Sequence, residues 1–132
     1  MRYAYPAIFK NEKKQVLVRV PDLPGTFTYG SDLPDAVYMA QDAASMWLWD
    51  AENGGEEIPA PSSLAEIGLG LTKKEYCSII VADTDEYRRK HDTRAVKKTL
   101  SIPAWLNYEA ERANAPFSQL LQESLKRYLQ LT

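Results

Sequence analysis

The stretch Ala95-Val96-Lys97-Lys98-Thr99-Leu100-Ser101-Ile102-Pro103 carries the most informative pattern in the chain. Its last four residues before the proline alternate between polar and apolar, which is the period of a β-strand. The apolar face of that strand would carry Leu100 and Ile102, and the polar face Lys97, Thr99 and Ser101. The proline ends the strand and can stand in the first turn of a helix.

Two helices are predicted after this strand. The first runs over residues 104–114 and places Trp105, Leu106, Tyr108 and Ala113 where helical packing can use them. Asn114 is typical of a residue that ends a helix. The second helix runs over residues 117–131, and its apolar side consists of Phe117, Leu120, Leu121, Leu125, Tyr128 and Leu129.

One strand and two helices in about 37 residues cannot bury enough apolar surface alone. The strand also lacks a partner within this segment. Two copies of the chain would solve both problems, because their strands can pair antiparallel while four helices cover the apolar face. The expected dimer core consists of Leu100, Ile102, Leu106, Leu120, Leu121 and Leu125.

The outer face of such a ribbon fits the major groove of DNA. We expect Lys97, Thr99 and Ser101 to contact base edges there. The first turn of the second helix offers free backbone N–H groups and the positive end of a dipole. The expected phosphate contacts are Lys98, Phe117 and Ser118.

This arrangement resembles the ribbon-helix-helix family of repressors from Val96 to about Leu129. The resemblance depends on residues 99–103, the helix with Leu106, the turn 114–118 and residues 120–125. That family commonly has a basic residue or Asn where this chain has Thr99 and Ser101. Two hydroxyls there indicate weaker or water-mediated base contacts. The alternative is a dimerisation hairpin without a role in DNA binding.

The front of the chain predicts a β-β-β-α-β module. Strands are expected at 3–9, 15–20, 26–30 and 76–82, with punctuation by Pro21-Asp22-Leu23-Pro24-Gly25 between the second and third. Residues 64–71 are ambiguous. Cys77 lies in an apolar run and is predicted to be a core residue.

The helix of this module follows Asp32, a plausible N-cap with Asp35 three residues on. Its apolar stripe consists of Leu33, Val37, Ala40, Ala44, Trp47, Leu48 and Ala51. Gly54-Gly55 ends it. The complete expectation is therefore an α+β chain, with the mixed module at 1–83, a linker or fraying helix at 84–94, and the ribbon-helix-helix domain at 95–132.

Charge separates the two halves. Residues 1–92 contain ten Lys or Arg and fifteen Asp or Glu, whereas residues 93–132 contain six and three. The basic tail suits phosphate and the acidic front suits a basic partner, although a solvated acidic surface is the alternative. The chain lacks a signal-peptide pattern and any apolar run long enough to cross a membrane, which favours a cytoplasmic protein.

The front module also resembles the HicB antitoxin family across most of residues 3–81. The shared motifs are residues 5–9, residues 21–25, Gly30 before a helix, and Ile58-Pro59-Ala60-Pro61-Ser62. The resemblance implies a reduced RNase H-like fold and a partner, the small, basic, RNA-cleaving HicA toxin. It also implies repression of the operon that both share. Candidate toxin contacts are the helix and the Pro-rich segments, with Asp22, Leu23, Pro24, Pro59 and Pro61.

An enzymatic role is not expected. Metal-dependent phosphodiester cleavage needs several carboxylates around a divalent ion, and the first strand, residues 2–10, contains none. Asp42 and Asp83 are scattered acids, His91 has no visible partners, and Asp22 is expected to shape its own turn. We predict no metal and no cofactor. The remaining alternative is a stand-alone repressor whose front module assembles dimers or senses a small molecule.

Overall fold

Four antiparallel strands form one sheet in the order β3-β2-β1-β4. The computed structural model describes residues 1–131, and the strands are β1 (Arg2–Asn11), β2 (Val16–Arg19), β3 (Phe27–Gly30) and β4 (Glu75–Asp83). A tight hairpin joins β1 to β2, with Glu12 N donating to Gln15 O at 2.9 Å. The β-β-β-α-β order that the sequence predicted is confirmed.

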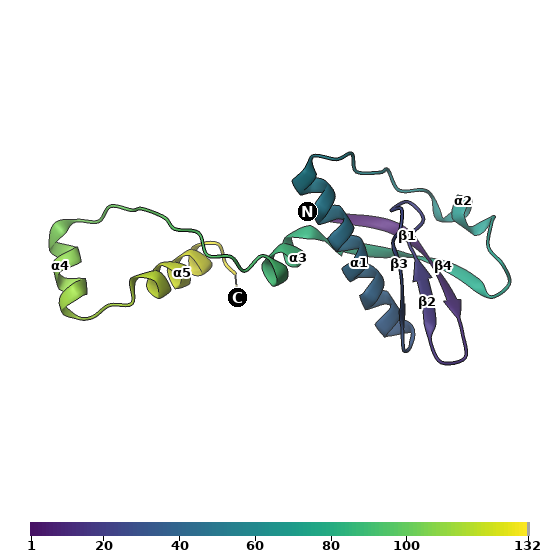
Figure 1. The fold of residues 1–132 in the computed structure, drawn as a ribbon, viewed down its shortest axis with the longest axis horizontal. Coiled ribbons are helices and arrows are strands. Elements are labelled where there is room, and N and C mark those ends of the chain that lie inside the picture. Colours follow the sequence, from purple (N-terminus) through teal and green to yellow (C-terminus); the bar gives the residue numbers. More distant parts are fainter. Residues whose placement is uncertain (132) are drawn as a thin grey trace. The chain divides into compact units, whose positions relative to one another are not determined.

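One long helix, α1 (Leu33–Gly54), packs against one face of the sheet (Figure 1). The side chain of Asp32 caps it by accepting from Asp35 N at 2.9 Å, and Asp35 in return accepts from Ser31 N at 2.8 Å. Gly55, with φ of +68°, ends the helix in the left-handed conformation. The core between helix and sheet consists mainly of Tyr5, Ala7, Phe9, Val16, Val18, Val20, Leu23, Ala36, Ala40, Ala44, Leu48, Ile80 and Ala82.

The buried stripe of α1 differs in part from the predicted one. Ala36 and Ser45 are buried although they were not expected to be, and Leu33 is 44 % exposed. Small residues are used at the start of the stripe because the backbone of β3 comes very close. A Cβ added to Gly30 would lie 2.2 Å from the Ala36 nitrogen.

Two short helices complete the first unit. α2 (Leu64–Gly68) contacts β4, and Cys77 lies half-buried beside it, with Sγ 3.8 Å from Leu64 O. Cys77 is therefore not a core residue, because along β4 it alternates with the positions of Ile80 and Ala82, which face the core.

Of the two alternatives predicted for residues 84–94, a linker or a fraying helix, the structure has a helix, α3 (Thr84–His91). Asp83 caps it by accepting from the backbone N–H groups of Asp85 and Glu86, and the helix packs against α1. The rings of Tyr87 and His91 stack with centroids 4.1 Å apart. The first compact unit accordingly extends from Met1 to Arg94.

The second compact unit, Ala95–Thr132, contains α4 (Ala104–Arg112) and α5 (Phe117–Tyr128). Asn114 has φ of +55° at the end of α4, as the sequence predicted. Residues 92–103 are neither helical nor paired in a sheet in this single chain, and no residue from 95 to 131 is buried.

Candidate functional sites

The polar residues predicted to face DNA lie together in the extended segment before α4. Lys97, Lys98, Thr99 and Ser101 are all exposed, and the alternating Leu100 and Ile102 are about half-exposed. In an extended segment Lys97, Thr99 and Ser101 would point to one side, and Leu100 and Ile102, together with Lys98, to the other. No strand among residues 1–131 lies beside this segment in the single chain, so the two-faced ribbon stays a prediction.

The first turn of α5 contains two of the residues predicted to contact phosphate. Phe117 and Ser118 occupy its first turn, and Pro116 at the cap position provides no side-chain hydrogen bond to that turn. The first N–H groups of α5 therefore remain available, at the positive end of a twelve-residue helix.

Several large apolar side chains of the second unit are exposed. The six residues predicted for a dimer core are 37–55 % exposed, and they are Leu100, Ile102, Leu106, Leu120, Leu121 and Leu125. Trp105, Phe117 and Leu129 are likewise exposed. Soluble single chains rarely leave this much apolar surface in one short segment uncovered.

The residues predicted to contact a toxin prove to have structural roles as well. Leu23 is fully buried in the core, so its side chain cannot be a contact and that expectation is wrong. Asp22 does not bond to its own turn: its carboxylate accepts from the Ser62 backbone N–H and hydroxyl, at 2.9 and 2.6 Å.

The backbone carbonyls of the Pro-rich segments are also engaged. Pro24 O accepts from Trp47 Nε1 at 3.2 Å, and Pro59 O accepts from the Tyr5 hydroxyl at 2.5 Å. These bonds tie both segments to the body of the first unit. Pro24 and Pro61 keep exposed rings, while Pro59 is half-buried.

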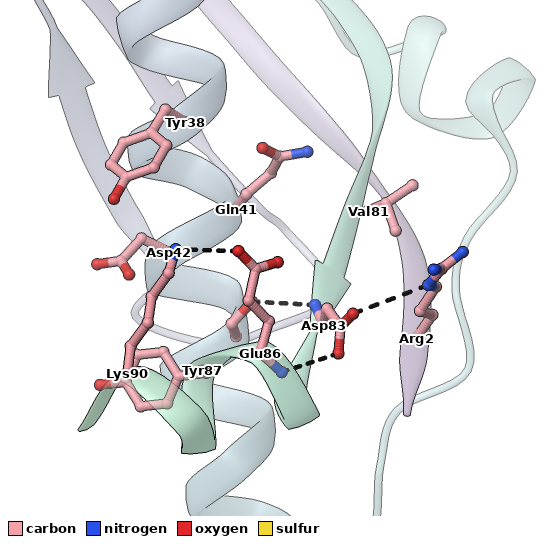
Figure 2. A pocket seen from close by; sticks show the side chains of 10 residues that line it. Arg2, Tyr38, Gln41, Asp42, Val81, Asp83, Glu86, Tyr87 and Lys90 are labelled. Atoms are coloured by element: carbon pink, nitrogen blue, oxygen red, sulfur yellow. Dashed lines mark hydrogen bonds and ion pairs between the residues drawn. The ribbon is translucent and has the colours of Figure 1, made fainter. Parts of the chain in front are cut away.

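The sequence did not reveal a pocket of about 330 Å³ between α1, β4 and α3 (Figure 2). Tyr38, Gln41 and Asp42 line it from α1, and Glu86, Tyr87 and Lys90 line it from α3. Val81, Asp83 and Arg2 form the part next to the sheet. No sequence motif marks it, because its walls come from three separated segments.

The pocket has more negative than positive groups. Lys90 Nζ lies 3.0 Å from Glu86 Oε1, and Arg2 Nε lies 3.8 Å from Asp83 Oδ2. Among residues 1–131, Asp42 has neither a hydrogen bond nor an ion pair. The hydrogen bond and charge of Glu86 raise the pKa of Lys90, with Asp42 adding to the shift, while desolvation and then the charges of Asp42 and Asp50 raise the pKa of Tyr87.

Asp42 and Asp83, the two acids considered for a nuclease, line this same pocket. Asp83 is committed to capping α3, and no group of three His, Cys, Asp or Glu residues placed to hold a metal occurs in the described part of the chain. None of the helices within residues 1–131 combines the length and hydropathy of a bilayer-spanning segment.

Residues 5–126 match the family model described as the HicB-like antitoxin of bacterial toxin–antitoxin systems. The chain belongs to this HicB-like antitoxin family. The resemblance seen in the front module is thereby confirmed, and the chain is an antitoxin of a toxin–antitoxin system, a non-enzymatic regulator. A similar curated protein is the uncharacterized 14.9 kDa protein in the rep–hol intergenic region of Haemophilus phage HP1 (strain HP1c1). It is 26 % identical over 108 residues, which cover 82 % of this chain and 79 % of that protein.

Solved structures of other antitoxins share the fold. The toxin–antitoxin complex from Streptococcus pneumoniae contains a chain with a TM-score of 0.63 and 23 % identity, covering 97 % of this antitoxin and 99 % of that chain. The Burkholderia pseudomallei antitoxin HicB gives 0.52 and 18 %, with 96 % of both chains covered. A chain of the HicA3 and HicB3 toxin–antitoxin complex gives 0.52 and 19 %, covering 61 % of this antitoxin and 99 % of that chain.

Proposed function

We propose that this antitoxin binds and neutralises a small, basic, mRNA-cleaving toxin of the HicA type through its first unit. We also propose that the second unit forms a ribbon-helix-helix dimer, with tetramers as a further assembly, which binds operator DNA and represses the operon encoding both proteins. The observation that carries the DNA-binding half is the exposed apolar set on residues 95–131.

The toxin-binding half is supported by family membership and by charge. Two of the structures that share the fold are toxin–antitoxin complexes, one of which contains a HicA toxin. The first unit carries an excess of carboxylates, which suits a basic partner. Complementary charge of this kind accelerates association and favours the correct partner.

The DNA-binding half is supported by the pattern of the second unit. Pairing of two copies of residues 96–102 would satisfy backbone groups that are unpaired in the single chain and would cover Leu100 and Ile102. The same pairing would display two sets of Lys97, Thr99 and Ser101 on one outer surface, the width of which suits a major groove.

The toxin-binding half is tested by co-expression with the small basic protein encoded beside the antitoxin gene. We expect the two proteins to purify together, and we expect the antitoxin to stop RNA cleavage by the purified toxin. Undiminished cleavage at a molar excess of antitoxin would contradict this half of the proposal.

The DNA-binding half is tested by fluorescence anisotropy with the promoter region upstream of the antitoxin gene and with an unrelated duplex of equal length. Specific binding should weaken steeply as salt increases, because phosphate contacts release counterions. Equal affinity for the two duplexes would leave no support for an operator-binding repressor.

A further inference from the structure

We infer that the toxin docks on the exposed face of α1, with one of its arginine side chains entering the pocket between Asp42 and α3. This inference depends on the proposed function, and it specifies the surface that performs the toxin-binding half.

All ionised side chains of α1 are acidic. Residues 33–54 contain four carboxylates, and no lysine or arginine occurs among them. Asp42 and Asp50 are exposed on its outer side, whereas Glu52 turns inward and accepts from the buried Thr84 hydroxyl at 3.1 Å. Two exposed carboxylates without a basic residue on the same helix attract a basic surface.

Two large apolar side chains interrupt the acids at helical spacing. Tyr38, Asp42, Met46 and Asp50 follow one another every four residues, so they lie on one face of α1. Tyr38 and Met46 are 55 % and 48 % exposed. Tyrosine and methionine are enriched in protein interfaces relative to the rest of a protein surface.

The pocket gives this face a point of attachment. Its volume of about 330 Å³ is at the lower end of the roughly 300–1,000 Å³ of small-molecule sites, which suits a single long side chain. Two tyrosine rings, Tyr38 and Tyr87, line it together with Asp42 and Glu86 (Figure 2). A guanidinium stacks on aromatic rings and bonds carboxylates in pairs, so arginine fits this lining better than lysine.

The pocket also lacks sufficient positive charge of its own. Lys90 is placed between two carboxylates, with its ion pair to Glu86 and with Asp42 contributing to its raised pKa. The single lysine leaves one negative charge uncompensated on the α1–α3 side. An arginine side chain of the toxin would bind Asp42 and neutralise this remaining negative charge.

The first experiment measures binding of the purified toxin, encoded beside the antitoxin gene, to full-length antitoxin variants by calorimetry. Asp42→Lys should raise the Kd about tenfold or more, since like charges then meet in the pocket. The matched control, Glu12→Lys, makes the same charge change on the exposed β1–β2 turn and should stay within about twofold. Asp42→Lys binding as tightly as Glu12→Lys would overturn the inference.

A second variant is expected to change the Kd for the toxin in the opposite direction. Lys90→Ala removes the antitoxin's own cation from the pocket, so we expect the Kd for the toxin to fall about two- to threefold at low salt. A Kd that rises in this variant would contradict the inference, because Lys90 itself would then be the contact. Unaltered thermal unfolding of both variants shows that these effects are not caused by misfolding.

Hydrogen exchange of the full antitoxin with and without the toxin gives a third measurement. Protection should appear over α1 and α3. Protection confined to the other face of the sheet, which exposes Phe27 and Tyr29, would overturn the inference while leaving the proposed function intact. If the unaltered antitoxin neither binds nor silences the toxin, the proposed function fails, and the inference fails with it.

Discussion

Gly30 ends β3 directly below the first turn of α1. Only a residue without a side chain fits there, because a Cβ would fall within 2.6 Å of three backbone atoms of Asp35 and Ala36. This close approach lets the helix lie flat on the sheet.

Gly30→Ala should therefore destabilise the first unit by about 2–3 kcal/mol, since the helix start must move away from the sheet. Gly68→Ala is the matched control: its Cβ would meet nothing within 4 Å, and the change should stay within about 0.5 kcal/mol. Urea unfolding followed by circular dichroism measures both. Equal stability of the two variants would show that α1 adjusts without cost.

Glu75 makes the stability of the first unit depend on pH. Its carboxylate accepts from Thr72 N at 3.1 Å and from Arg19 Nη1 at 2.7 Å. The hydrogen bond from the Thr72 backbone and then that from Arg19 hold the pKa of Glu75 below its ordinary 4.5. A carboxyl whose pKa is depressed by folding stabilises the fold above its ordinary pKa, and this contribution is lost as pH falls through the folded-state pKa.

Glu75→Gln should accordingly lower the free energy of unfolding at pH 7, and the difference from the unaltered chain should shrink as pH falls below 4.5. Urea unfolding at pH 7, 5 and 3 measures the difference. A difference that stays constant over this range would show that Glu75 stabilises the fold by packing alone.

At the scale of elements, the sequence predicted features that depend on neighbouring residues. It did not predict features that depend on tertiary contacts. The α1 cap by Asp32 and the turn at Asn114 were predictable because each depends on neighbours within four residues. The burial of Leu23 was not, because Pro-Gly turns are usually exposed and only the fold brings this one against the core.

The packing of helix α3 and the pocket beside it were not predicted, for a related reason. Residues 84–91 are nearly all polar and lack apolar periodicity, so the helix depends on its Asp83 cap and on packing of Tyr87 near Trp49. The pocket lining from α1, β4 and α3 meets only in the folded chain. The one available signal was the absence of basic residues from α1.

The extended segment 92–103 permits a test at this scale. Leu100→Asp would place an unpaired charge in the proposed dimer core at a cost of about 3 kcal/mol or more, which raises the dimer Kd at least about 100-fold. Thr99→Ala, one residue away on the opposite face, should leave dimerisation unchanged. Sedimentation equilibrium measures both, and a Leu100→Asp chain that dimerises like the unaltered one would rule out the proposed ribbon.

The whole molecule consists of two compact units whose charges differ in sign. If each unit has its own partner, single substitutions should separate the two activities. Asp42→Lys should weaken toxin binding about tenfold or more and keep operator affinity. Thr99→Ala should do the reverse, weakening operator binding by about 1 kcal/mol, or about fivefold, with less effect on unrelated DNA.

Reporter repression and RNA-cleavage assays on the same two variants measure this separation. A decrease of both activities in either variant would show that the two units do not act independently. The proposed assignment of toxin binding to the first unit and DNA binding to the second would then be wrong.

The lack of any buried residue from 95 to 131 has a consequence for the life of the antitoxin in a growing cell. If this part acquires a hydrophobic interior only when two copies meet, its folding is second order in antitoxin concentration. Dilution would then weaken promoter occupancy more than proportionally and would expose the tail to proteases at the same moment. At low concentration each remaining copy would be degraded faster, and the earlier resumption of antitoxin synthesis would oppose this loss.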